Sequence, residues 1–174
     1  MEPDYVIKIC LLGEANVGKT SLVYRFIENK FRDNYKSTLG VNLLKKDLNI
    51  ENYGGVAATI WDLGGQDSFR SLRKLYLEGA NGAMVIFDWT QKESFLKLDS
   101  WIQDFRLERE SEPILLIGNK DDLKDKEKVS KKETLELARR YGLDFLSTSA
   151  KTGSNVEEAF KAVIRTILES QSAQ

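Results

Sequence analysis

The glycine-rich run Gly13–Thr20 constrains the fold more than any other segment of this sequence. It has the pattern G-x-x-x-x-G-K-T, it directly follows the apolar run Val6–Leu12, and an amphipathic stretch over residues 22–27 comes after it. Glycines in such a loop let backbone N–H groups surround phosphate oxygens, and the helix that follows directs its positive end at them. The other interpretation, a glycine turn that leads into an ordinary helix, would not require an apolar strand directly before it and an amphipathic helix after it. The segment therefore predicts a nucleoside triphosphate site in an α/β fold.

Two side chains of this loop have a distinct expected chemistry. Lys19 reaches the β- and γ-phosphates, and the Thr20 hydroxyl binds Mg²⁺. The residues of this segment that we expect to bind the nucleotide are Gly13, Glu14, Ala15, Asn16, Val17, Gly18, Lys19, Thr20 and Ser21. The motif indicates a triphosphate but does not indicate its base.

The composition excludes several other kinds of chemistry. The 174 residues contain no histidine, which removes Ser-His-Asp and Cys-His catalysis. The one cysteine, Cys10, permits neither an internal disulfide nor a multi-thiolate zinc site, and we expect it in the core. The net charge of −1 argues against a broad electrostatic interaction with nucleic acid. At this length, we expect a single domain over residues 1–174.

The sequence carries no targeting signal, so we expect a cytoplasmic protein. No apolar run approaches the roughly 18 residues of a membrane span. Glu2 stands where a myristoylation site requires glycine, and the last residues include no prenylation cysteine. Peripheral membrane association is therefore expected only through a missing tail or a partner.

Short apolar runs alternate with segments of helical periodicity, a pattern typical of βαβ units. The expected buried strands are Val6–Leu12, Ala83–Asp88, Ile114–Gly118 and Leu143–Thr148. Two further runs, Val41–Ile50 and Val56–Asp62, flank Gly54-Gly55, a pair suited to a hairpin turn. The expected fold is α/β, with a six-stranded, mostly parallel sheet, one antiparallel edge hairpin and about five helices.

Local signals also predict where helices begin. In three places a short polar residue is followed three positions later by glutamate, as in a capping box. These pairs are Ser130 with Glu133, Thr90 with Glu93, and Asn155 with Glu158. Apolar residues recur at helical spacing over residues 95–105 and 156–167, which predicts one buried face on each of these segments.

The run Asn119-Lys120-Asp121 is the candidate for reading the base. It follows the apolar run Ile114–Ile117 and thus lies at the carboxyl end of an expected parallel strand, where such folds bind ligands. A carboxylate there accepts from both the N1–H and the 2-amino group of guanine, whereas adenine offers no such donor pair. Asp121 is therefore the expected specificity residue, with the stem of Lys120 along the base. On its own, the tripeptide is also compatible with a polar strand exit.

Asp62 ends the second hairpin strand and opens the run Asp62–Gln66. A strand-terminal aspartate can hold Mg²⁺ through water, as Walker-B acids do. Gly65 leaves its backbone N–H free to donate to a γ-phosphate, and Gln66 can orient water. Taken alone, residues 62–66 are also compatible with a flexible glycine loop. Together with the upstream phosphate loop, they indicate the catalytic side of the site.

In their order and spacing, these motifs resemble the Ras superfamily of small GTPases over about residues 5–170. The motifs that carry the resemblance are the phosphate loop Gly13–Thr20, the first switch Tyr35–Val41, the second switch Trp61–Gln66, and the base motifs Asn119–Asp122 and Ser149–Lys151. The resemblance implies a small GTPase fold that binds GTP or GDP with Mg²⁺.

The resemblance also implies roles for single residues. Thr38 is expected to bind Mg²⁺ and the γ-phosphate only in the GTP state, and losing that phosphate relaxes both switches. Phe31 is expected edge-on against the guanine, Tyr35 over the phosphates, and the Ala150 N–H on the guanine O6. The expected nucleotide-binding residues beyond the phosphate loop are Phe31, Tyr35, Thr38, Gly65, Asn119, Lys120, Asp121, Ser149, Ala150 and Lys151.

Within the superfamily the chain is most similar to Rab proteins, in Ser37–Asn42 and Trp61–Phe95. The run Asp62–Gln66 departs from them in carrying glycine where Rab and Ras proteins have alanine, as Arf proteins do. Only about five residues precede the first strand, which leaves no room for the amphipathic anchor helix of an Arf protein. Ala15 stands where Ras has glycine and Rab proteins often have serine, close to the expected attacking water.

The reaction implied is GTP + H₂O → GDP + phosphate, with Gln66 as the catalytic residue and a slow unaided rate, on the order of 10⁻³ s⁻¹ or below. The implied partners are effectors that read the switches, an exchange factor and a GTPase-activating protein. Two alternatives stay open. One is a GTP-loaded binding scaffold with little hydrolysis, which Ala15 favours and Gln66 opposes. The other is a P-loop ATPase or kinase, which Asp121 and Ala150 oppose.

Overall fold

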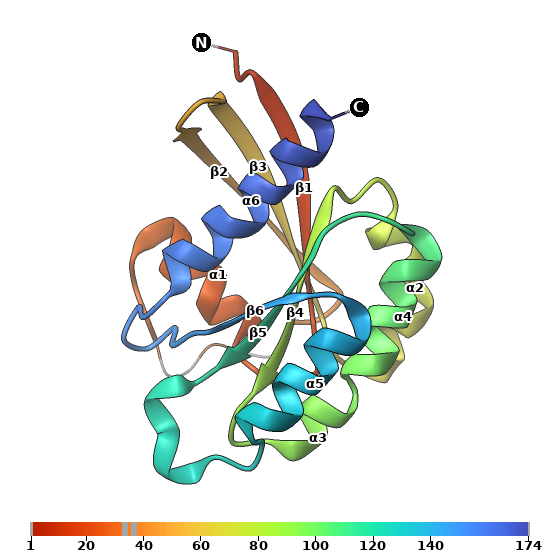
Figure 1. The fold of residues 1–174 in the computed structure, drawn as a ribbon, viewed down its shortest axis with the longest axis vertical. Coiled ribbons are helices and arrows are strands. Elements are labelled where there is room, and N and C mark those ends of the chain that lie inside the picture. Colours follow the sequence, from red (N-terminus) through yellow and green to blue (C-terminus); the bar gives the residue numbers. More distant parts are fainter. Residues whose placement is uncertain (1, 33–34, 36–37, 174) are drawn as a thin grey trace.

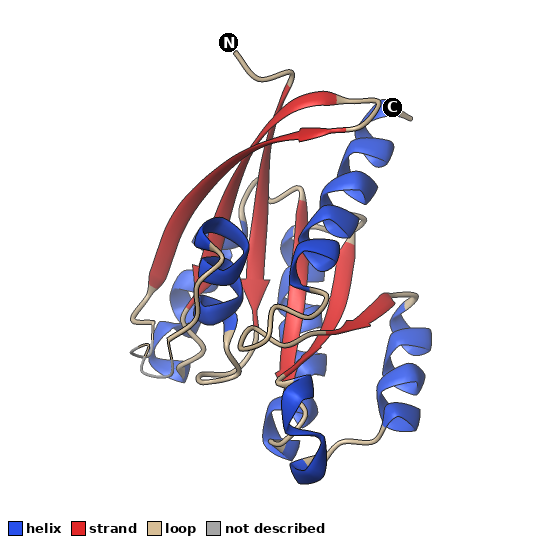
Figure 2. Cartoon of the chain, turned by 90° about the vertical axis from the view of Figure 1, so that its left-hand side faces the viewer, coloured by secondary structure: helices blue, strands red, loops and turns tan. Residues whose placement is uncertain are grey.

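A six-stranded sheet forms the centre of the molecule, in the order β2-β3-β1-β4-β5-β6 (Figures 1 and 2). The computed structural model describes residues 2–32, 35 and 38–173. The strands are β1 Tyr5–Leu12, β2 Val41–Ile50, β3 Gly54–Leu63, β4 Gly82–Asp88, β5 Ile114–Asn119 and β6 Asp144–Ser147. β2 pairs antiparallel with β3, and all the other pairs are parallel. The expected parallel sheet with an antiparallel edge hairpin is confirmed.

Helices cover both faces of this sheet. They are α1 Lys19–Glu28, α2 Arg70–Leu77, α3 Lys92–Leu96, α4 Leu98–Glu108, α5 Lys131–Tyr141 and α6 Val156–Ser172. The described residues thus form six α-helices where about five were expected, because Lys97 separates α3 from α4. α1 and α6 pack on one face, and α2, α4 and α5 on the other. None of the helices in the described part of the chain is both long and apolar enough to cross a membrane.

β1 shows why both faces of the sheet need cover. Ile7, Ile9 and Leu11 belong to the hydrophobic cluster under α1 and α6, whereas Cys10 and Leu12 belong to the cluster under α4 and α5. Successive side chains of a strand point to opposite faces, so the half of β1 that is buried on both sides, residues 9–12, is apolar. Because the parallel strands run the same way, the loops after β1, β3, β4, β5 and β6 all meet at one edge of the sheet.

The hairpin turn differs from the expectation. The chain reverses at Glu51–Tyr53, where Asn52 has a φ of 71° and the Tyr53 N–H donates to the Ile50 carbonyl. Gly54 and Gly55 instead begin β3, so the expected turn at this glycine pair was wrong. The Gly55 N–H donates to the Asp4 carboxylate at 2.8 Å, and this contact holds the N-terminal segment on the hairpin.

Of the three expected helix caps, only Ser130 with Glu133 forms a capping box. Thr90 bonds to Asp88 instead, through both its N–H and its hydroxyl, and α3 begins later, at Lys92. Asn155 has a φ of 58°, and its side-chain amide donates to the Ser147 carbonyl at 2.9 Å. Asn155 does occupy the N-cap position of α6, as expected, but without a side-chain cap bond. The side chains of Thr90 and Asn155 form loop contacts instead, as short polar side chains do when other polar groups lie nearby.

Candidate nucleotide-binding site

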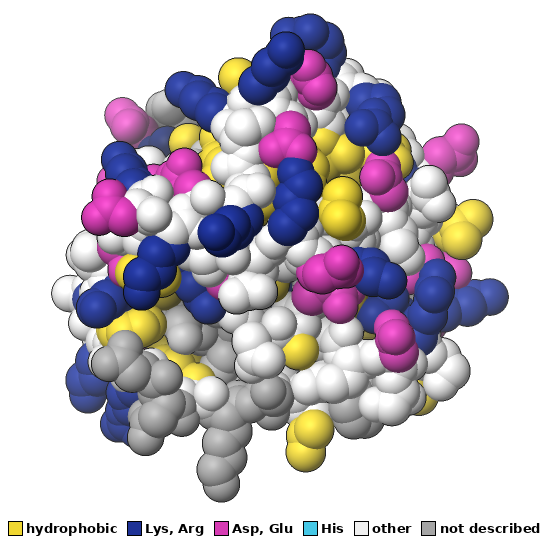
Figure 3. Space-filling model, turned by 90° about the horizontal axis from the view of Figure 1, so that it is seen from below, with side chains coloured by type: hydrophobic (Ala, Val, Ile, Leu, Met, Phe, Trp, Pro, Cys, Tyr) yellow, Lys and Arg dark blue, Asp and Glu magenta, His cyan; other side chains and the backbone are white. Residues whose placement is uncertain are grey.

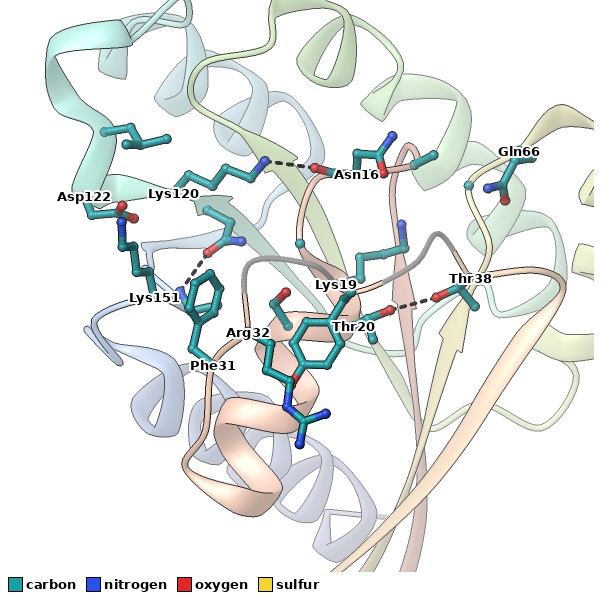
Figure 4. Close-up of a pocket in the computed structure, with 18 residues that line it drawn as sticks. Asn16, Lys19, Thr20, Phe31, Arg32, Thr38, Gln66, Lys120, Asp122 and Lys151 are labelled. Carbon is teal, nitrogen blue, oxygen red and sulfur yellow. Dashed lines mark hydrogen bonds between the residues drawn. The ribbon is translucent and has the colours of Figure 1, made fainter.

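A cavity opens where the parallel strands end, and Figure 4 shows the side chains around it. Residues from both switches, the phosphate loop and both base motifs line it. The expected nucleotide or catalytic residues in this lining are Ala15, Asn16, Gly18, Lys19, Thr20, Ser21, Phe31, Tyr35, Thr38, Gly65, Gln66, Asn119, Lys120, Ala150 and Lys151. Figure 3 shows the molecule from below, the side on which the strands end, with basic and acidic side chains interspersed. Recognition at this end therefore depends on individual groups and not on a broad field of one sign.

The phosphate loop Gly13–Thr20 curls around the ammonium group of Lys19. Lys19 Nζ donates to the carbonyls of Gly13 at 2.9 Å and Glu14 at 2.8 Å. Burial lowers the pKa of Lys19 to about 8, and the acidic groups of Asp62 and Glu14 oppose this shift. Gly13 has a φ of 149°, and a Cβ at this position would lie 2.3 Å from the Ile86 carbonyl oxygen, so only glycine fits. The loop thus presents a cation and the N-terminus of α1 to the cavity.

Three side-chain oxygens that could bind a metal ion meet at one place, from Thr20, Thr38 and Asp62. The Thr20 and Thr38 hydroxyl oxygens lie 2.7 Å apart (Figure 4), and Thr20 also donates to Asp62 Oδ2. Thr38 Oγ1 lies 3.2 Å from the same carboxylate oxygen, and burial raises the pKa of Asp62. Asp62 Oδ1 is buried with no hydrogen-bond partner among the described residues. Lys36 and Ser37 of the expected first switch lie outside the described residues.

The second switch lies directly against the phosphate loop. A Cβ on Gly65 would be 2.2 Å from the Ala15 backbone nitrogen, so the close approach requires glycine. The Gly64 N–H donates to the Gly40 carbonyl at 2.7 Å and links the two switches. Gln66 Oε1 is buried with no hydrogen-bond partner among the described residues. A buried acceptor without a partner is rare in folded proteins, and here it belongs to a residue that lines the cavity.

The base motifs are held by contacts within the protein. Asn119 Nδ2 donates to the Val17 carbonyl at 2.9 Å, and Asn119 Oδ1 accepts from the Ala150 N–H at 3.3 Å. Lys120 Nζ pairs with Asp88 at 2.8 Å and donates to the Asn16 carbonyl at 3.0 Å. These bonds join β5, the phosphate loop and the loop after β6 into one unit.

Asp122, and not Asp121, lines the cavity, so the expected position of the base-reading carboxylate needs correction. Lys120 has a φ of 68°, after which the chain enters a 3₁₀ turn over Asp121–Lys126. The Asp121 N–H donates to the Thr148 carbonyl, its carboxylate lies 3.9 Å from Lys124 Nζ, and it is not among the residues that line the cavity. The Asp122 carboxylate accepts from the Ser149 hydroxyl at 2.7 Å.

Comparison with known proteins agrees with this geometry. A sequence model described as the Ras family matches residues 8–169. The chain is 36% identical over 167 residues to Ras-related protein Rab-13 of Canis lupus familiaris, which covers 95% of this chain and 81% of the relative. It is 38% identical over 166 residues to human Ras-related protein Rab-8B, an alignment that covers 95% of this chain and 80% of the relative.

This chain belongs to the Ras family. Its relatives include Rab-27B of Rattus norvegicus, at 35% identity over 176 residues, which makes it a Rab-like small GTPase. It is therefore a guanine-nucleotide switch that hydrolyses GTP to GDP and phosphate slowly, in the regulation of membrane traffic. The family match opposes both alternatives, the GTP-loaded scaffold and the P-loop ATPase or kinase.

Two residues that position the base site of this GTPase were missed in the sequence. Arg25 of α1 donates from Nε to the Ala150 carbonyl at 2.8 Å and from Nη2 to the Lys151 carbonyl at 2.6 Å. Asp88 ends β4 fully buried and holds Lys120. Arg25 is one of several charges on an amphipathic helix, and no local pattern distinguishes it. Asp88 carries a signal that could have been used, because it is a carboxylate at the end of a buried parallel strand.

Tyr35 of the first switch lies against α1 in this structure. Tyr35 stacks on Tyr24, with ring centroids 5.1 Å apart and an interplanar angle of 8°. Phe31 and Tyr35 both line the cavity. The expected positions of Phe31 on the guanine and Tyr35 over the phosphates remain predictions about the nucleotide-bound protein.

Proposed function

We propose that this GTPase forms one G domain over residues 1–174 and binds GTP or GDP with Mg²⁺ in the cavity at the strand ends. One observation carries the proposal. The cavity has the phosphate loop, three converging oxygen donors and Gln66 at one end, and Asp122 with the Ala150 N–H at the other. This is the arrangement that a guanine nucleotide requires, with its base and its triphosphate held by different loops.

At the base end, the Asp122 carboxylate accepts from the guanine N1–H and 2-amino group. The Ala150 N–H, whose bond to Asn119 Oδ1 is long at 3.3 Å, also donates to O6. Ser149 holds Asp122 in place through its hydroxyl. The stem of Lys120 covers one side of the base while its ammonium group stays on Asp88. Phe31 lies on the edge of the guanine. Adenine lacks the paired donors that Asp122 needs, so this end selects guanine.

At the phosphate end, Thr20 and Thr38 would hold Mg²⁺ through their hydroxyls and Asp62 would hold it through water. Oxygen donors of this kind are the ligands that Mg²⁺ prefers, and the unpartnered Asp62 Oδ1 fits a role toward such a shell. Mg²⁺ held there would supply positive charge to the phosphates. Loss of the γ-phosphate removes a partner from Thr38 and from Gly65, and this loss releases both switches.

Gln66 orients the attacking water through its unpartnered Oε1, while Lys19 and the phosphate-loop amides stabilise charge on the γ-phosphate. Without an added arginine the rate stays on the order of 10⁻³ s⁻¹ or below, so a GTPase-activating protein accelerates the reaction and an exchange factor reverses the state. Effectors read the switches and the helix that follows the second one, where Leu39 of the first switch is 76% exposed and Leu75 of α2 is 61% exposed. The GTPase acts in the cytoplasm and reaches membranes through peripheral association.

Two measurements on the purified protein test this function. The nucleotide released by denaturation is identified by chromatography, and we expect GDP or GTP. Phosphate release from added GTP is then followed in a single turnover, with Gln66→Leu as the matched variant. Bound adenine nucleotide, or equal hydrolysis by the parent and Gln66→Leu, would contradict the proposal.

A further inference from the structure

A buried cation lies on α2, the helix that follows the second switch, outside the residues assigned to the nucleotide. The Arg73 side chain of α2 is only 6% exposed. Removing a full charge from water costs several kcal/mol unless close partners replace the solvent. An arginine is normally most stable with its charge in water, so the burial of Arg73 needs an explanation. The partners of Arg73 therefore indicate what it does.

Arg73 packs on one face of α4. Its guanidinium carbon lies 3.5 Å from the centroid of the Trp101 ring, and Nη1 lies 3.1 Å from Asp104 Oδ2. Trp101 and Asp104 are three residues apart on α4, so they share a face of the helix. The indole stacks on the cation and the carboxylate pairs with it, and together they hold α2 against α4.

Trp101 extends this contact to the phosphate loop. Its indole Nε1 donates to Glu14 Oε1 at 2.9 Å, and the Trp101 side chain is buried. Glu14 lies in the stretch of backbone on which Gly65 rests, and its carbonyl accepts from Lys19. A continuous series of contacts thus runs from α2 through α4 to the loop that surrounds the phosphates.

Gln66 lies in the sequence between two residues, Gly65 and Arg73, that are both connected to the phosphate loop. Gly65 touches the loop directly, and Arg73 reaches it through Trp101 and Glu14. Only the 3₁₀ turn Asp67–Phe69 and the first turn of α2 separate Gln66 from Arg73. We propose that Arg73 is a positioning residue for GTP hydrolysis, which holds α2 so that Gln66 stays within reach of the γ-phosphate. This inference rests on the role proposed above for Gln66.

Arg70 provides a matched control on the same helix. It carries the same charge one turn earlier and reaches the same Asp104, at 3.8 Å, but its side chain is 59% exposed. An exposed ion pair of this kind contributes little to stability. Arg70→Met and Arg73→Met therefore remove equal charge from α2, and only the second removes the stacked contact with α4.

Single-turnover phosphate release tests the proposal in the parent, Arg70→Met, Arg73→Met and Arg73→Lys, each with and without Gln66→Leu. We expect Arg73→Met to slow hydrolysis about tenfold, Arg70→Met to stay within twofold of the parent, and Arg73→Lys to lie between them, because lysine keeps the charge but not the planar stack. GDP affinity should change less than threefold. If Arg73 acts through Gln66, Arg73→Met should have no further effect in the Gln66→Leu background.

Three results would overturn the proposal. Equal rates for Arg70→Met and Arg73→Met would show that the stacked contact is not needed. An equal loss on Arg73→Met in the parent and in the Gln66→Leu background would show a general structural effect. Unchanged hydrolysis on Gln66→Leu alone would remove the proposed role of Gln66 and this inference with it. If Arg73→Met fails to fold, Trp101→Phe keeps an aromatic ring but loses the donor to Glu14, and an unchanged rate there would also count against the proposal.

Discussion

The two ends of the nucleotide cavity are built differently. At the base end, the polar groups already bond to one another, as Asn119 does with Val17 and Ala150. At the phosphate end, Asp62 Oδ1 and Gln66 Oε1 are buried with no hydrogen-bond partner among the described residues. The base motifs are held by bonds within the protein, whereas the phosphate end keeps two buried acceptors that fit groups of a ligand.

This difference suits a switch that holds one base in two states. A preorganised base end loses little conformational entropy on binding and treats GDP and GTP alike. At the phosphate end the ligand supplies the missing partners, so the contacts there differ between the GDP-bound and the GTP-bound protein. The contacts of Gly65 and Thr38 can therefore report the nucleotide state while guanine stays in place.

The largest expected effect comes from breaking the base end. Asp122→Asn should weaken GTP binding about a hundredfold, roughly 2.7 kcal/mol, because it exchanges an acceptor for a donor opposite the guanine 2-amino group. The same variant should prefer xanthosine triphosphate, whose edge matches the amide. Competition binding against a fluorescent GDP measures both affinities.

The neighbouring carboxylate serves as the control. Asp121 does not line the cavity, so Asp121→Asn should change GTP affinity less than threefold. A large loss in Asp121→Asn with none in Asp122→Asn would restore Asp121 as the specificity residue and contradict the geometry of this loop.

Asp121 and Asp122 also show how much of the site can be predicted from the sequence. The phosphate loop, the strands and the edge hairpin follow from local patterns, since a G-x-x-x-x-G-K-T run between a strand and a helix has few other uses. The choice between Asp121 and Asp122 depends on the left-handed backbone of Lys120, which no composition or periodicity reveals. The same holds at Asn52, where the hairpin turns ahead of the glycine pair.

Contacts between distant residues were beyond sequence reasoning for another reason. Trp101 and Glu14 are separated by 87 positions, and Arg25 and Ala150 by 125. Helical periodicity correctly assigns Trp101 to a buried face. It does not show which polar partner lies at the end of the indole, because that depends on how the helices pack around the sheet.

Removal of a metal ligand should change the phosphate end alone. Thr20→Asn should raise the preference for GDP over GTP about thirtyfold, close to 2 kcal/mol, because it removes a hydroxyl that would hold Mg²⁺, which favours the triphosphate. The ratio of the two affinities, measured with and without a chelator, checks this. Without Mg²⁺ the variant and the parent should show the same ratio. A difference that persists in the chelator would assign Thr20 a role other than metal binding.

The catalytic residue gives a smaller effect because the unaided reaction is already slow. Gln66→Leu should reduce single-turnover hydrolysis about tenfold, near 1.4 kcal/mol, while nucleotide affinity is unchanged. Ala15 lies beside Gly65 and lines the cavity, so its methyl group can mask part of the difference. The comparison is therefore made in Ala15→Gly as well. Equal hydrolysis by Ala15→Gly with and without Gln66→Leu would exclude Gln66 as the catalytic residue.

The smallest expected effect comes from loosening a support of the base end. Arg25→Met removes two hydrogen bonds to the loop that carries Ala150 and Lys151. We expect GDP and GTP to dissociate about threefold faster, by equal factors, since about 0.7 kcal/mol is lost in a contact common to both states. Stopped-flow release of a fluorescent nucleotide measures this. A change in the GDP-to-GTP ratio would link the base end to the switch and weaken the contrast between the two ends.

Amide hydrogen exchange in the GDP-bound protein and in the protein with a non-hydrolysable GTP analogue tests this contrast most directly. The account predicts equal protection in both states for residues 119–122 and 149–151. It predicts added protection with the analogue for residues 38–40 and 64–66, where the third phosphate supplies partners to Thr38 and Gly65. Protection that changes as much in the base motifs as in the switches, or that changes in neither, would contradict it.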